Sequence, residues 1–328
     1  MATSGSWDYS LTAANIVDMA VENLGILHSG GTIVAADQTL ALRRLNVIAK
    51  QFQGVADKAQ GLKIHTRQRI TLVLAKGQQS YLIGPASTDA RASTQVGRTT
   101  IDVAEAAGQT VISVAATSDT TSYPGTTLTM TASDIIGIEQ TSGVIFWSTV
   151  SSISAGDTVT IASGLDSAAA VGRHVYWFTS RAQRFPHLEA AVLRTDAFQD
   201  TPLIVYRDVQ SYELGVVDKN QDEDPTSILV EPLRIATRVT FDTQPDDMGK
   251  TVVITALYPA EDYDATTDDI AFPQEWLRPL AWEVSFEIAP AFGAQWTPAM
   301  EQLRQESLQT ARQLNPDTAD LYFQPGRE

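Results

Sequence analysis

The C-terminal third of the chain contains the stretch Phe272-Pro-Gln-Glu-Trp-Leu-Arg-Pro-Leu-Ala-Trp-Glu-Val-Ser-Phe-Glu-Ile288. Its apolar residues recur at the three- and four-residue spacing of one face of an α-helix. Pro273 suits the first helical position, whereas Pro279 removes a hydrogen bond and costs about 3 kcal/mol inside a helix. We therefore expect a helix that kinks at Pro279 or begins near Arg278. Its structural face comprises Trp276, Leu277, Leu280, Ala281, Trp282, Val284, Phe286 and Ile288.

Three further stretches have helical patterns. Two lie near the N-terminus, with apolar faces that end near Leu27 and Phe52, and a short glycine-containing loop separates them. This arrangement predicts an antiparallel helical hairpin. The third follows Thr297-Pro298 and ends at Asn315-Pro316. The expected N-caps are Ser10 or Thr12, Asp37 and Thr297.

Strand-forming residues dominate between the helical ends. Arg69–Leu74 and Ser80–Ile83 flank a glycine-containing loop, which predicts a β-hairpin. From about residue 86 to 172, Ser, Thr, Ala and Gly prevail, and short strand-like runs have the spacing of a small β-sandwich or barrel. These runs are Thr110–Ala115, Asp134–Gln140, Val144–Val150 and Asp157–Ala162. The strands expected later are His174–Phe178, Pro202–Tyr206, Ser227–Val230, Ile235–Phe241 and Thr251–Tyr258.

Together these patterns predict an α+β fold. The N- and C-terminal helices and a β layer would form a body from residues 1–85 and 173–328. Residues 86–172 would form a small β-sandwich or barrel module inserted into that body, because other elements of the body lie on both sides of it in the sequence.

The composition excludes several classes of function. The chain has 328 residues, a formal net charge of −16 and no cysteine. Thiolate chemistry and disulfides are therefore excluded, and a lasting wrap around nucleic acid is not expected without a basic cluster. No apolar run reaches the roughly 18 residues of a membrane span, and Met1–Trp7 lacks the pattern of a signal peptide. We expect a protein made in the cytoplasm, with no membrane partner.

Metal-binding and catalytic motifs are missing from the sequence. The four histidines, at positions 28, 65, 174 and 187, lack the spacing of metal ligands. The acidic stretch Asp262–Asp268 lacks the glycine and glutamate that a calcium loop needs. No phosphate-binding loop and no nucleophile elbow occurs. We therefore expect no catalytic residue, no cofactor and no metal.

Two sets of residues leave other functions open. Glu283 and Glu287 share a helix face and could form the acid–base pair of a cell-wall hydrolase carried on a virion. Like charges at that spacing are more typical of a solvated or intersubunit surface. Trp147, if exposed, could be the sugar platform of a carbohydrate-binding decoration protein.

Several stretches resemble the head-to-tail adaptor, or tail accessory, family of short-tailed bacteriophages. The opening Tyr9-Ser-Leu-Thr-Ala-Ala-Asn-Ile-Val17 with Leu24-Gly25-Ile26 is similar to the family's first helix, and Phe52-Gln-Gly54 to the end of its second. The series Tyr258-Pro-Ala-Glu-Asp-Tyr-Asp264, Phe272–Trp282 and Glu287-Ile-Ala-Pro-Ala-Phe-Gly293 is closely similar to one that family members carry at the same place. Leu72–Gly84, Asp134–Glu139 and Val144–Val150 are similar to further parts of the family, and Pro279 departs from its pattern.

The resemblance implies a structural virion protein that acts at the head–tail junction. Such subunits form a ring, usually of twelve copies, that docks beneath the portal protein and receives the tail hub or nozzle protein. The ring prolongs the DNA channel and retains packaged DNA, so DNA would be a transient cargo, and an acidic wall would repel it rather than bind it. The inserted module would project outward, where it could hold a tail fibre or spike.

The C-terminal segment carries the aromatic cluster Leu321, Tyr322 and Phe323, with no regular element of its own. Clusters of this kind anchor in pockets of partner proteins. Because C-terminal segments of the resembling family grip the portal, we expect these residues at the portal or subunit interface.

Overall fold

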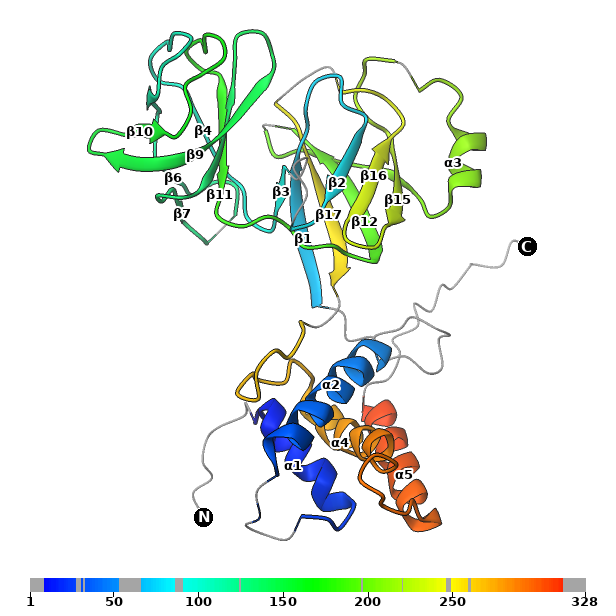
Figure 1. Ribbon diagram of the computed structural model, residues 1–328. Coiled ribbons are helices and arrows are strands. Elements are labelled where there is room, and N and C mark those ends of the chain that lie inside the picture. The colour runs from blue at the N-terminus through cyan, green and yellow to red at the C-terminus, as the bar shows by residue number, and fades with distance from the viewer. Residues whose placement is uncertain are drawn as a thin grey trace, which may run out of the picture. The chain divides into compact units, whose positions relative to one another are not determined.

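The computed structural model describes residues 9–27, 31, 33–52, 66–85, 91–123, 125–195, 197–219, 221–245, 249–258 and 261–314. The fold is mixed α+β, and strands outnumber helices among these residues. The chain divides into two units, Met1–His65 with Pro259–Glu328, and Thr66–Tyr258 (Figure 1). We call them the helical unit and the β unit.

Four helices build the helical unit. They are α1 (Ala13–Asn23), α2 (Ala35–Phe52), α4 (Gln274–Ile288) and α5 (Pro298–Leu314). Thr12 caps α1 and forms a capping box with Asn15, which settles the choice between Ser10 and Thr12. Asp37 lies in the first turn of α2 rather than at its cap, because the helix begins two residues earlier.

Proline placement differs from the expectation in α4. Pro273 occupies the N-cap, and Pro279 lies inside a helix that begins at Gln274, so the expected start near Arg278 is wrong. Pro279 is buried, and its neighbours Leu280 and Trp276 belong to the apolar core of the unit. Burial of this wide apolar face offsets the loss of one hydrogen bond.

The helical core joins both ends of the sequence. Ile16 and Val17 of α1 are fully buried with Leu45 of α2 and with Leu280 and Val284 of α4. Ala311 of α5 packs against the same cluster. The hydrophobic effect therefore holds the first and last helices together in one core.

Two sheets of the β unit face each other across a shared core. The five-stranded sheet has the order β13 (Asp200–Pro202), β12 (His187–Arg194), β17 (Thr251–Tyr258), β1 (Thr66–Val73), β3 (Ala92–Ser93). The four-stranded sheet has the order β14 (Ile204–Tyr206), β15 (Ser227–Pro232), β16 (Thr237–Phe241), β2 (Ser80–Ile83). Ile70 and Ile254 from the first sheet and Val239 and Phe241 from the second belong to one buried cluster, so this part is a β-sandwich.

The expected hairpin between residues 69–74 and 80–83 is wrong. β1 pairs with β17 and β3, whereas β2 pairs with β16 in the other sheet. The intervening loop crosses from one layer to the other, and the hydroxyl of Tyr81 accepts a hydrogen bond of 2.8 Å from the amide of Ala75. Both strands direct apolar side chains into the shared core. Two strands in facing layers bury these side chains as well as two paired strands of a hairpin would, so the apolar pattern does not distinguish the two arrangements.

Six of the remaining strands form a closed barrel. Their order is β4 (Gly97–Thr100), β11 (His174–Phe178), β8 (Ile135–Glu139), β9 (Ile145–Ser154), β10 (Thr158–Ile161), β5 (Val111–Ser113). The ends meet because Ile101, after β4, bridges to Val114, after β5, and the amide of Ala115 donates to the carbonyl of Thr100 at 2.9 Å. The interior holds Ile136, Ile138 and Trp177. A short ribbon, β6 (Ser118–Asp119) with β7 (Leu128–Thr129), and helix α3 (Val209–Gly215) complete the unit.

Residues 86–172 supply most of this barrel, although β11 lies beyond them. The contact-based division into units falls at 65/66 and 258/259. A body of 1–85 with 173–328 and a module of 86–172 therefore stays a prediction. No helix of the described ranges is both long and apolar enough to cross a membrane.

Candidate functional site

The helices α4 and α5 bring together a group of charged and aromatic side chains that we call the α4–α5 cluster. It comprises Glu283 and Phe286 on α4, Glu301 and Arg304 on α5, and Trp296 in the connection between them. Thr297 caps α5 as expected, since its hydroxyl accepts from the amide of Met300 at 3.3 Å. The cap fixes the start of α5, and Glu301 and Arg304 then fall on adjacent turns.

Arg304 is the centre of the cluster. Its Nη1 donates to both carboxylate oxygens of Glu283, at 2.8 and 2.9 Å, which joins α5 to α4. Its Nε and Nη2 donate to the two oxygens of Glu301, at 3.1 and 2.9 Å. The guanidinium also lies over the ring of Phe286, at 4.7 Å from the centroid. A planar guanidinium can serve two carboxylates and one ring at once, which a lysine cannot.

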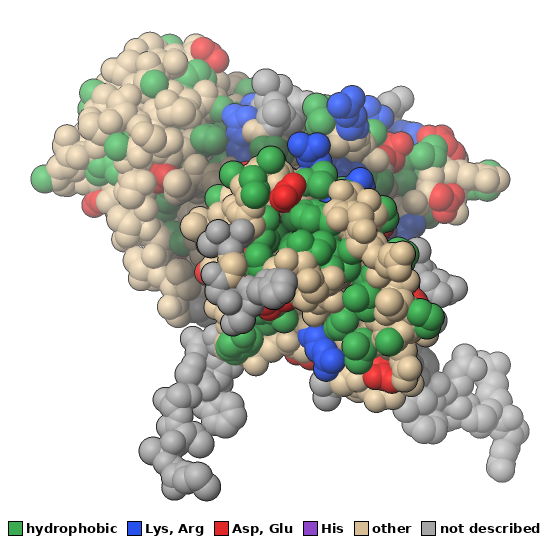
Figure 2. All heavy atoms as spheres, turned by 60° about the horizontal axis from the view of Figure 1, so that its bottom comes forward, with side chains coloured by type: hydrophobic (Ala, Val, Ile, Leu, Met, Phe, Trp, Pro, Cys, Tyr) green, Lys and Arg blue, Asp and Glu red, His purple; other side chains and the backbone are tan. Residues whose placement is uncertain are grey.

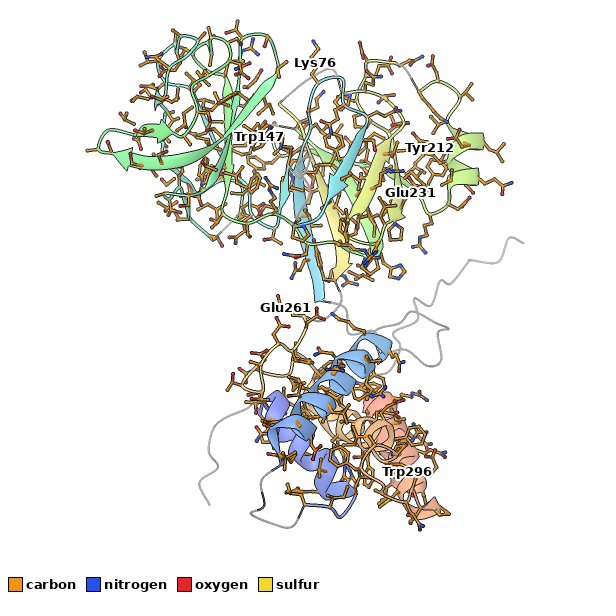
Figure 3. The ribbon with its side chains drawn as sticks, in the orientation of Figure 1. Lys76, Trp147, Tyr212, Glu231, Glu261 and Trp296 are labelled. Atoms are coloured by element: carbon orange, nitrogen blue, oxygen red, sulfur yellow. The ribbon has the colours of Figure 1, made fainter. Side chains whose placement is uncertain are left out.

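Trp296 closes the aromatic side of the cluster (Figure 3). Its ring meets Phe286 edge to face at a centroid distance of 5.2 Å and Trp282 at 6.2 Å. Its indole N–H donates to Glu301 at 3.1 Å. The connection between α4 and α5 is therefore held by both ring contacts and a hydrogen bond.

The two carboxylates of the cluster have pKa values shifted in opposite directions. Burial raises the pKa of Glu283, against the opposing effect of Arg304. Hydrogen bonds from Arg304 and Gln305 lower the pKa of Glu301 to about 2. Glu287, one turn beyond Glu283, lies 3.8 Å from Arg44 of α2. Both glutamates of the suggested acid–base pair thus face arginines of the same chain.

The predicted helix face is placed mainly in the core. Trp276, Leu280 and Trp282 are buried, whereas Phe286 is 40% exposed beneath Arg304. A second exposed apolar residue of this unit is Leu303 on α5, which is 38% exposed. Hydrophobic side chains also gather on the face of the helical unit seen in Figure 2. Around the α4–α5 cluster, Phe286 and Leu303 therefore leave apolar side chains partly exposed beside the Arg304 ion pairs.

Leu321, Tyr322 and Phe323 lie outside the described residues, so their role at an interface stays a prediction. Trp147 of the barrel is half-buried, with Arg91 over its ring at 4.7 Å. Its six-membered ring also covers Gly137, the residue opposite it on β8. A guanidinium over the ring is unfavourable for stacking of the same ring on a sugar.

Metal-binding groups are not found in the described part of the chain, where no cluster of three or more His, Asp or Glu side chains could hold a metal ion. Sequence reasoning missed Arg304 as the partner of Glu283 and Trp296 as the partner of Glu301. The available signal was weak: Glu301 and Arg304 stand three apart on one helix, a spacing typical of an ion pair. Nothing in the sequence indicated that Glu283 would face them across two helices.

Comparisons with known proteins add little. Neither a scan against models of protein families nor a search of curated proteins finds a match. Among solved structures, the chain is similar to the VP16–VP17 complex of the two major capsid proteins of bacteriophage P23-77, with 10% identity, a TM-score of 0.15, and coverage of 60% of this chain and 79% of that one. VP17, a capsid protein of the same phage, has 8% identity, a TM-score of 0.15, and coverage of 60% and 75%. Similarity at this TM-score carries no argument about fold or function.

Proposed function

We propose that the chain is a structural virion protein, a subunit of the ring that joins the portal of a short-tailed phage to its tail. The ring would contain about twelve copies, by the family resemblance, with obligate contacts between neighbours. It would dock beneath the portal protein, extend the DNA channel, retain the packaged DNA and receive the tail hub or nozzle.

One observation carries the proposal: resembling stretches from opposite ends of the sequence share the buried core of the helical unit, and the segment that joins Asp264 to Phe272 is hydrogen-bonded to the opening stretch. The amide of Ala13 donates to the carbonyl of Asp268 at 2.8 Å, and the amide of Ile270 donates to that of Leu11 at 2.9 Å. Between them, Thr12 bridges to Asp269. Motifs that share a structural role are expected to pack together in this way, which supports reading them as one family signature.

A second pair of hydrogen bonds links α2 to the Tyr258–Asp264 stretch. The side-chain amide of Asn46 donates to the carbonyl of Tyr263 at 2.8 Å, and its oxygen accepts from the amide of Tyr263, also at 2.8 Å. Three of the resembling segments, around α1, α2 and α4, thereby share one core.

The charge of the chain fits a channel wall. A net charge of −16 on each copy would repel passing DNA and prevent it from sticking. The ion pairs that occupy Glu283 and Glu287 and the covered ring of Trp147 favour this proposal over the hydrolase and the decoration protein.

Complementation of a phage that lacks the gene tests the proposal. We expect lysates of such a phage to contain heads without tails that lose their DNA, and we expect purified protein to convert fresh heads into infectious particles. Complete tailed particles in the mutant lysate, defective only in entering the host, would favour the hydrolase instead and exclude the ring.

A further inference from the structure

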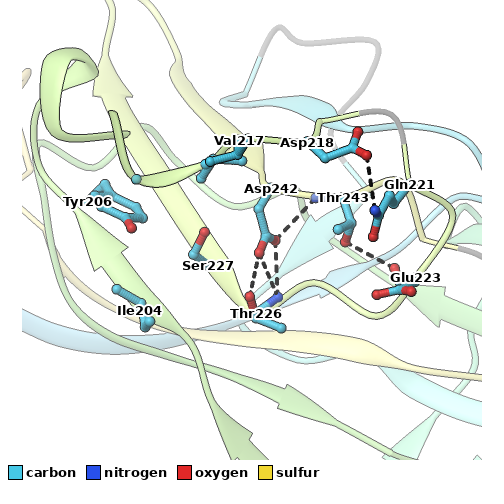
Figure 4. A pocket seen from close by; sticks show the side chains of 12 residues that line it. Ile204, Tyr206, Val217, Asp218, Gln221, Glu223, Thr226, Ser227, Asp242 and Thr243 are labelled. Atoms are coloured by element: carbon cyan, nitrogen blue, oxygen red, sulfur yellow. Dashed lines mark hydrogen bonds between the residues drawn. The ribbon is translucent and has the colours of Figure 1, made fainter. Parts of the chain in front are cut away.

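A pocket of about 310 Å³ lies in the β unit between α3 and the strands β14 to β16, in a part of the chain that the proposed function does not use. Figure 4 shows Tyr206, Ser227 and Asp242 around it. The residues that line it are Ile204, Tyr206, Gly215, Val216, Val217, Asp218, Gln221, Glu223, Thr226, Ser227, Asp242 and Thr243.

The pocket is acidic. Asp218, Glu223 and Asp242 line it, and none of its lining residues is a lysine, arginine or histidine. Asp242 is already used, since it accepts from the amides of Thr226 and Thr243 at 3.0 and 3.1 Å. Asp218 accepts from the side-chain amide of Gln221 at 3.0 Å. The exposed carboxylate of Glu223 has no partner among the described residues.

Ser227 gives an independent indication of a ligand. Its side chain lines the pocket and only 3% of the residue is exposed. Its hydroxyl oxygen is buried and has no hydrogen-bond partner within the described part of the chain. A buried hydroxyl without a partner costs free energy, so such groups usually face a ligand or water.

The rim of the pocket is apolar and adjoins a sheet edge. Ile204 is 61% exposed and Val217 is 96% exposed, and Leu214 nearby on α3 is 77% exposed. β14, which carries Ile204 and Tyr206, pairs only with β15 and is the terminal strand of its sheet. An extended peptide can add to such an edge and direct alternate side chains into a pocket.

We propose that this pocket binds the lysine or arginine side chain of an extended segment from a partner protein. Asp218 and Glu223 would hold the cationic group, and Ser227 would accept one of its N–H bonds. The stem would pack between Ile204 and Val217, and Tyr206 would line the side of the pocket. A bare metal ion is disfavoured because the described acidic groups do not converge as ligands. The proposal stands independently of the virion role.

Binding of short peptides to the full chain tests this. The probes are acetyl-Thr-Val-Lys-Val-Thr-amide, the same peptide with arginine at the centre, and the same peptide with norleucine, which has a similar stem and no charge. Nuclear magnetic resonance on the labelled protein should show shifts at Val217, Ser227 and Thr243 for the two cationic peptides. We expect the norleucine peptide to bind about tenfold more weakly.

Variants separate the pocket from general attraction to an acidic protein. Glu223→Gln and Asp218→Asn should each lower the affinity for the lysine peptide about five- to tenfold. Asp102 is an exposed carboxylate on the barrel, and Asp102→Asn should leave that affinity unchanged. Ser227→Ala should weaken binding while leaving the thermal stability equal or higher, because it removes a hydroxyl without a partner. Equal binding of the norleucine peptide, no binding of either cationic peptide, or unchanged affinity in Glu223→Gln or Ser227→Ala would overturn the proposal.

Discussion

The side chain of Asn46 on α2 forms two hydrogen bonds of 2.8 Å with the backbone of Tyr263, a residue 217 positions away. It donates to the carbonyl and accepts from the amide. A side-chain amide can imitate a peptide group in this way, because it carries one donor and one acceptor side by side. The contact fixes the chain just before α4 against α2. It is one of the contacts that hold the N-terminal helices against the C-terminal part of the helical unit.

Asn46→Ala should therefore destabilise the helical unit by about 1–3 kcal/mol, because two backbone groups of Tyr263 lose their partners. Asn46→Asp keeps the acceptor but sets a carboxylate oxygen against the carbonyl of Tyr263, so it should cost at least as much. Urea unfolding followed by circular dichroism at 222 nm measures both. Gln51→Ala, at an exposed site of the same helix, is the control, and an equal effect there would contradict the assignment.

The ion pair between Glu283 and Arg304 should matter more than that between Glu287 and Arg44. Glu283→Gln leaves a largely buried guanidinium with one carboxylate fewer, and we expect a loss of about 1–3 kcal/mol in the free energy of unfolding. Glu287→Gln removes a longer and more exposed contact and should stay within about 0.5 kcal/mol of the wild type. A peptidoglycan-degrading activity lost in either variant would revive the hydrolase.

The barrel depends on two glycines that face tryptophans across neighbouring strands. A Cβ on Gly137 would lie 2.6 Å from the ring of Trp147, and one on Gly97 would lie 2.2 Å from that of Trp177. Gly137→Ala should cost about 1–3 kcal/mol through overpacking. Adding Trp147→Leu should recover part of that loss, since the side chain in the way is removed. Additive effects of the two substitutions on the unfolding free energy would show that the ring does not cause the cost.

Asp119 should make the barrel sensitive to acid. Burial raises its pKa, but hydrogen bonds from Ser122 and Thr121 outweigh burial, and the pKa lies below its usual value. Its contribution to stability is then complete above the unfolded pKa of about 3.9 and is lost as the pH falls through the lower folded value. Unfolding curves between pH 5 and pH 2 should fall more steeply for the wild type than for Asp119→Asn. Parallel curves would show that Asp119 is not responsible.

Local pattern predicted the elements well and their partners poorly. The apolar faces of α1 and α2 and the strands β8 to β11 follow directly from periodicity and turn residues, because these signals act within about ten residues. The layer change between β1 and β2 could not be predicted, since both pairings bury the same side chains. The short helix α3 and the strand β12 were also missed. α3 rests on a cap at Asp208 and one buried residue, Tyr212, which is too weak a pattern to stand out.

The candidate site was predicted only in part. Trp276, Leu280 and Trp282 of the expected helix face are buried, whereas Phe286 of the same face lies under Arg304 at the surface. Phe286 lies at the surface because Arg304 of α5 packs over it. That contact depends on the angle and register between α4 and α5, which neither helix's sequence indicates by itself. The pocket at Ser227 gave no signal at all, because its residues come from four separated segments.

The C-terminal aromatic cluster provides a test of the portal contact. Replacing Leu321, Tyr322 and Phe323 together with alanine should abolish association with the portal protein, since aromatic anchors carry a large share of interface energy. The stability of the helical unit should not change. Pull-down with purified portal and urea unfolding measure the two effects. Undiminished portal binding would remove these residues from the interface.

The most direct test of the central claim is the mass of the purified protein with and without the matching portal protein, measured by native mass spectrometry. The account predicts that a complex of ring size, with close to twelve copies of this chain on each portal, appears only when portal is added. A chain that stays monomeric at every ratio of the two proteins would contradict it.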